Sequence, residues 1–87
     1  MNEIAAAKIT IVLYRLEQGN FSNVKVLGKG ILEYKIDFGP GYRIYFGRHG
    51  EKLIILLDGG TKNEQDKDIA LAKKHWVEYK KRYMNET

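Results

Sequence analysis

Residues 34–47, which read YKIDFGPGYRIYFG, predict a β-hairpin. Apolar and polar side chains alternate on both sides of Gly39-Pro40-Gly41, and this period of two is typical of strands with one face on a core. Glycine and proline supply the backbone conformations that a turn requires. One face is apolar, with Tyr34, Ile36, Phe38, Tyr42, Ile44 and Phe46, and the other carries Lys35, Asp37, Arg43 and Tyr45.

The turn also predicts which residues of the two strands face each other. If Phe38 is the partner of Tyr42, Asp37 lies opposite Arg43. Lys35 then becomes a diagonal neighbour of Arg43, with ~7–8 Å between their α-carbons.

Two interpretations of this polar face remain open. In the first, Asp37 and Arg43 form an exposed ion pair worth at most about 1 kcal/mol, and Lys35 is simply solvated. In the second, the face binds phosphate, with Arg43 as the forked donor and Lys35 and Lys62 as point charges.

Helices and further strands are expected on both sides of the hairpin. Residues 3–18 carry an apolar stripe of helical spacing and end before Gly19, a residue that favours helix termination. Strands are expected at residues 24–27, 31–38, 42–47 and 53–57. The last of them is apolar throughout, which predicts a central strand covered on both faces.

A second helix is expected from about residue 62. Thr61 and Glu64 have the spacing of a capping box, in which each side chain bonds a backbone amide of the first turn. Its apolar stripe comprises Ile69, Ala72, Trp76, Tyr79 and Tyr83, which we expect to pack in the core, and residues 84–87 are expected to fray. The expected architecture is α+β: a helix, a short strand, a three-stranded antiparallel meander and a C-terminal helix.

Size and composition limit the possible functions. A chain of 87 residues predicts one domain over residues 1–87. Without cysteine it forms neither disulfides nor thiolate metal sites, which favours the reducing cytoplasm. The formal net charge of +4 favours an acidic partner such as nucleic acid. No apolar run approaches the ~20 residues of a membrane span, so no membrane is expected as a partner.

Neither histidine has a second ligand at a metal-binding spacing. We therefore expect His49 and His75 to be surface residues, and we expect no metal and no cofactor.

Two blocks of the sequence match a known family pattern. They are Gly39-Pro40-Gly41-Tyr42-Arg43-x-Tyr45-Phe46 and Gly59-Gly60-x-Lys62-x-x-Gln65-x-x-Asp68-Ile69. With the segments around them they make residues 5–72 resemble the RelE/ParE toxin superfamily, in its branch of HigB-like addiction module killer proteins. The resemblance implies the toxin of a type II toxin–antitoxin system that inhibits translation as a metal-independent, ribosome-dependent mRNA endonuclease (an mRNA interferase).

The resemblance also implies roles for individual residues. Arg43 stands where the catalytic arginine of RelE-type members stands, Lys35 matches a strand lysine, and Lys62 matches the lysine after the last strand. RelE itself carries a second lysine where this chain has Asp37 and a tyrosine near the end of the site where this chain has Ile69, so Tyr45 is the nearest phenol by sequence that could donate a proton. The implied sites are catalytic Arg43, Lys62, Lys35 and Tyr45, and RNA-binding Lys35, Arg43, Arg48 and Gln65.

The implied partners are a cognate helix-turn-helix antitoxin and mRNA on the ribosome. Members of the family usually begin with a strand that has no counterpart here, which predicts an exposed sheet edge and a possible homodimer. The alternative is a binder without nuclease activity, either a gyrase poison or a degenerate toxin that only binds its antitoxin.

Overall fold

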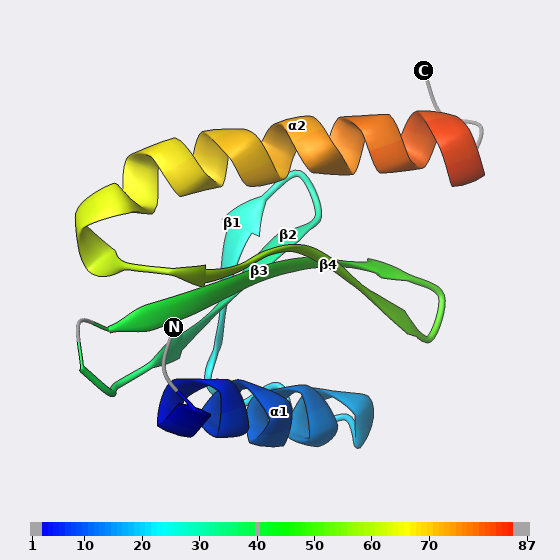
Figure 1. Cartoon of the computed structure of the whole chain (residues 1–87). Coiled ribbons are helices and arrows are strands. Elements are labelled where there is room, and N and C mark those ends of the chain that lie inside the picture. Colours follow the sequence, from blue (N-terminus) through cyan, green and yellow to red (C-terminus); the bar gives the residue numbers. More distant parts are fainter. Residues whose placement is uncertain (1–2, 40, 85–87) are drawn as a thin grey trace.

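The computed structural model describes residues 3–39 and 41–84. A four-stranded antiparallel sheet lies between two helices, with α1 on one face and α2 on the other (Figure 1). The elements are α1 Glu3–Glu17, β1 Val24–Gly28, β2 Ile31–Ile36, β3 Tyr42–His49, β4 Lys52–Gly60, the 3₁₀ turn η1 Lys62–Glu64, and α2 Gln65–Tyr83. The α+β class and the order of elements are confirmed. Pro40 of the turn and residues 85–87, where fraying was expected, lie outside the described residues.

Two apolar clusters hold the helices to the sheet. On the α1 face, Ile9, Val12 and Leu16 pack against the apolar set of the hairpin, including Ile44 and Phe46. This is the pairing that the helical stripe and the strand alternation predict, because each is apolar on one side only.

The α2 face is built around Trp76. Its indole is buried and donates a hydrogen bond to the Lys29 carbonyl at 3.1 Å. Gly47 leaves space for the ring, since a β-carbon there would lie 2.7 Å from Cη2 of Trp76. The packing role expected for the α2 stripe holds for Trp76 and Ala72, whereas Tyr83 at its end is exposed.

The sheet order is β1-β2-β3-β4, so β4 is an edge strand. The expectation of a central strand was wrong. Its apolar run arises because both helices cover parts of it: Leu53 packs with the α1 cluster, and Leu56 is buried in the α2 cluster. Ile55 pairs with Phe46 and so lies on the α1 side of this edge strand, where it is 40% exposed.

The hairpin register differs from the expected one by two residues. The last pair before the turn is Ile36 with Tyr42, so Lys35 lies directly opposite Arg43 rather than diagonal to it. The turn is wider than expected, because strand pairing already stops at Ile36 and Tyr42. Within it the Gly41 amide donates to the Phe38 carbonyl at 3.1 Å. A shift by two keeps every side chain on its expected face.

The capping box does not form. Thr61 makes no side-chain capping hydrogen bond, and the chain enters α2 through η1 instead. The amide of Glu64 bonds the carbonyl of Thr61 at 3.1 Å, which closes this tighter turn.

Within residues 3–39 and 41–84, neither helix is long and apolar enough to cross a membrane.

Candidate functional site

The candidate catalytic residues Arg43 and Tyr45 lie on the sheet face that α2 covers. Arg43 is 5% exposed and Tyr45 is completely buried. Both are on β3, an interior strand, so neighbouring strands flank them and the first turns of α2 lie over them. The expected phosphate-binding face is therefore closed at its centre.

Five residues form what we call the polar cluster: Glu33, Arg43, Tyr45, Gln65 and Asp68. Arg43 Nε lies 3.9 Å from Glu33 Oε1, and Arg43 Nη1 donates to the Gly41 carbonyl at 3.3 Å. Gln65 Nε2 donates to Glu33 Oε2 at 3.1 Å and ties the start of α2 to β2. Glu33, with both of these neighbours, is thus the centre of the cluster.

Asp68 reaches the cluster from the first turns of α2. It is 7% exposed and packs against Gly60, where a β-carbon would collide with the carboxylate. The glycine at the end of β4 therefore lets this part of α2 approach the sheet closely.

The polar cluster is incompletely satisfied. Among the described residues, three buried polar atoms have no hydrogen-bond partner in the protein: Arg43 Nε, the Tyr45 hydroxyl oxygen and Asp68 Oδ2. A buried polar group of this kind costs about 1–3 kcal/mol. Such groups are uncommon and call for an explanation other than packing.

Burial, followed by the charge of the Glu33 carboxylate, raises the pKa of Tyr45 to about 12, while Arg43 acts in the opposite direction. The phenol therefore keeps its proton throughout the neutral range.

The other predicted site residues lie outside this cluster. The ammonium of Lys35 pairs with Asp37 at 3.4 Å, and their side chains are 50% and 87% exposed. Lys62 is exposed in η1, just before α2. Arg48 lies on the opposite, α1 face of the sheet, with its guanidinium 4.8 Å from the centre of the Phe21 ring.

The structure thus brings Arg43, Tyr45 and Gln65 together and leaves Lys35 and Lys62 at the surface around them. It separates Arg48 from the set. The expected pair of Asp37 with Arg43 is replaced by two pairs, Lys35 with Asp37 and Arg43 with Glu33.

Sequence reasoning did not single out Glu33 and Asp68 as site residues. A signal existed for each. Glu33 shares the alternating face of Lys35, and Asp68 lies four residues before Ala72 on the stripe that packs on the sheet.

Both histidines, expected at the surface, are partly exposed and also bond to other elements. His49 Nδ1 lies 2.9 Å from the Tyr79 hydroxyl, and His75 Nδ1 donates to the Leu56 carbonyl at 2.7 Å. Both are half-buried because α2 packs along the sheet, so they join the helix to the strands.

Over 69 residues the chain is 49% identical to a protein of Haemophilus influenzae described as an uncharacterized protein. The match covers 79% of this chain and 70% of that protein. The two chains belong to one family. The description of the H. influenzae protein names no activity, so membership of its family assigns none. No family model matches the chain, and no solved structure does. The RelE/ParE assignment stays a prediction.

Proposed function

We propose that this protein is the cytoplasmic toxin of a type II toxin–antitoxin pair and that it acts by binding a macromolecular target rather than by cleaving RNA. The toxin assignment is supported by the RelE/ParE-like blocks around Arg43 and Lys62. The mode of action is supported by one observation: Arg43 is 5% exposed and paired with Glu33 beneath α2.

Cleavage of RNA by this family's chemistry needs groups in contact with the reacting phosphate. The 2′-oxygen attacks phosphorus and loses its proton to a base, and the bond to the 5′-oxygen breaks as that oxygen gains a proton. Arg43 and Tyr45 have no route to a phosphate while α2 covers them. The exposed cations Lys35 and Lys62 remain able to contact an acidic partner.

The second candidate is the ribosome-dependent mRNA endonuclease. It is favoured by the unpaired polar atoms of the polar cluster. Buried polar groups without a partner lower the stability of the fold, and proteins often retain such groups because they serve a function. Displacement of the first turns of α2 would expose Arg43 beside Lys62. In that form Arg43 and Lys62 would bind the phosphate, and Lys35 would act as base or electrostatic helper. Tyr45 would be the nearest phenol for the proton.

The two candidates are separated by induced expression in a bacterial host without the antitoxin gene. Growth, integrity of mRNA on ribosomes and the DNA damage response are followed for the wild type and for Lys62→Ala. Lys52→Ala is the matched control, because Lys52 is also exposed but lies at the far end of β4. Neither lysine is buried, so neither variant is expected to unfold.

Growth arrest with intact mRNA supports the proposal, and an accompanying DNA damage response supports gyrase as the target. Growth arrest with rapid mRNA cleavage that Lys62→Ala abolishes and Lys52→Ala retains overturns it in favour of the nuclease. If expression causes no growth arrest, the remaining candidate is a degenerate toxin that only binds its antitoxin. If this protein then also fails to bind the product of the adjacent gene, the toxin assignment itself is wrong.

A further inference from the structure

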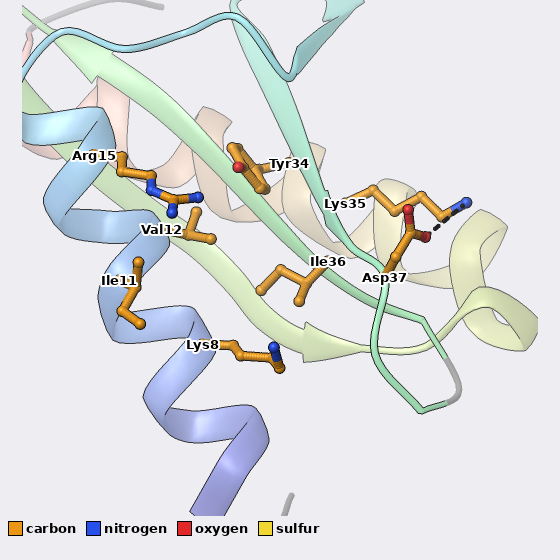
Figure 2. A pocket seen from close by; sticks show the side chains of 8 residues that line it. All are labelled: Lys8, Ile11, Val12, Arg15, Tyr34, Lys35, Ile36 and Asp37. Atoms are coloured by element: carbon orange, nitrogen blue, oxygen red, sulfur yellow. Dashed lines mark ion pairs between the residues drawn. The ribbon is translucent and has the colours of Figure 1, made fainter.

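An open groove lies on the other side of the molecule, between α1 and β2 (Figure 2). It is a cavity of about 250 Å³. The helix contributes Lys8, Ile11, Val12 and Arg15, and the strand contributes Tyr34 and Ile36. The side chains of Lys8, Val12 and Arg15 extend toward the strand (Figure 2). The groove is separate from the polar cluster, which faces α2.

The groove is open because β1 is too short to flank all of β2. Pairing between these strands stops at Val24 with Tyr34. Lys35 and Ile36 pair with β3 on one side, and β1 gives them no partner on the other. This end of β2 is therefore a free sheet edge, the kind of edge to which an extended chain can add as a further strand.

The walls of the groove combine apolar surface with positive charge. Ile11 is 50% exposed beside the buried side chain of Ile36, so the groove offers apolar surface that solvent reaches. The exposed cations Lys8 and Arg15 lie about two helical turns apart on the same side of α1, each about one turn from Ile11. The one carboxylate in the lining, Asp37, is paired with Lys35 at 3.4 Å and points away from the helix (Figure 2).

We infer that this groove binds an extended, acidic segment of a partner protein. The segment adds to the free edge at Lys35 and Ile36, places an apolar side chain against Ile11, and places carboxylates on Lys8 and Arg15. Charge complementarity selects this occupant over a neutral one. The inference does not depend on the proposed function, because α2 and the polar cluster take no part in it.

The test uses isotope-labelled protein and synthetic peptides followed by amide NMR. The probe is a capped peptide with the sequence Glu-Val-Asp-Ile-Glu-Val-Asp, which alternates acidic and β-branched residues. A second peptide has Gln and Asn in place of the acids. A third keeps the acids but has proline at the apolar positions, which removes the amides that strand addition needs. Saturable shifts at Lys35, Ile36 and Asp37, seen with the first peptide alone, are expected.

Charge-reversal variants locate the contact. Lys8→Glu and Arg15→Glu are each expected to weaken binding of the acidic peptide roughly fivefold to tenfold. Lys73→Glu, an equal change at an exposed position of α2, is expected to leave the affinity within a factor of about two because it is on the far side of the sheet.

Three results would overturn the inference. The first is no saturable binding at millimolar peptide, and the second is an equal loss of affinity from Lys73→Glu. The third is tighter binding of a single-stranded RNA oligonucleotide than of the acidic peptide to the same amides, which would make the groove a nucleic-acid site.

Discussion

The buried pair of Glu33 and Arg43 predicts a particular pattern of stability in a double-mutant cycle. Arg43→Met removes the charge and keeps much of the side-chain volume. It leaves the Glu33 carboxylate, 5% exposed, with Gln65 as its hydrogen-bond donor and no cation beside it. Breaking a buried ion pair in this way costs about 3–5 kcal/mol. Chains of 87 residues unfold with roughly 4–13 kcal/mol, so the variant loses a large share of its stability.

The double variant Glu33→Leu with Arg43→Met removes both charges. Since burying two charges costs about as much as their attraction returns, this variant is expected within about 2 kcal/mol of the wild type. Its stability should exceed that of Arg43→Met alone. A matched surface control is Lys35→Met, whose pair with Asp37 is exposed and worth about 1 kcal/mol or less.

The assay is urea unfolding followed by fluorescence of Trp76, the only tryptophan, which is 4% exposed and so reports on the α2 face. A cost below about 1 kcal/mol for Arg43→Met would refute the reasoning, because the guanidinium would then have to be solvated. So would a double variant that is less stable than both single variants. The cycle also matters for any test of activity, since loss of toxicity in an Arg43 variant is informative only when the protein still folds.

Three further predictions concern stability. Gly47→Ala is expected to lower the free energy of unfolding by about 1–3 kcal/mol, because the added methyl group meets the buried Trp76 ring. The loss should be smaller in a Trp76→Phe background, and equal losses in both backgrounds would contradict this contact. Thr61→Ala is expected to change the free energy of unfolding by less than about 0.5 kcal/mol, whereas loss of a real side-chain cap costs about 1 kcal/mol. Tyr45 has a folded-state pKa of about 12 against 10.0 when unfolded, so the unfolded phenol ionises first. The free energy of unfolding should therefore fall by about 2 kcal/mol between pH 10 and 12, and urea titrations across this range should show no such contribution in Tyr45→Phe.

The fold was predictable because its helices and strands are mostly apolar on one face only, and such faces must pack against each other. The alternation around Ile44 and Phe46 requires a cover on that face, and the stripe that includes Val12 supplies it. These periodicities are properties of the local sequence. They survive even a register error of two residues, since such a shift does not exchange the faces of a strand.

The closed state of the candidate site was not predictable in the same way. Alternation shows that Arg43 and Tyr45 share a face, but it does not show what lies on that face. The covering element is α2, whose stripe includes Trp76 and Tyr79 and could have packed on another surface. The close approach depends on Gly47 and Gly60, whose missing side chains make room for Trp76 and Asp68.

The edge position of β4 was missed for a related reason. A continuous apolar run indicates cover on both faces, and both helices do cover parts of β4. Cover on both faces is compatible with an edge as well as with a centre, because the faces and the hydrogen-bonding edge of a strand are independent.

The account depends most directly on Arg43 being closed off beneath α2. Phenylglyoxal modifies exposed arginines, and mass spectrometry reports the rate at each of Arg15, Arg43, Arg48 and Arg82. The other three arginines, Arg15, Arg48 and Arg82, are exposed and serve as internal references. We predict that Arg43 of the native protein reacts on the order of 100-fold more slowly than they do and reacts at their rate after unfolding in urea. Reaction of native Arg43 as fast as Arg48 would contradict the account and favour the nuclease.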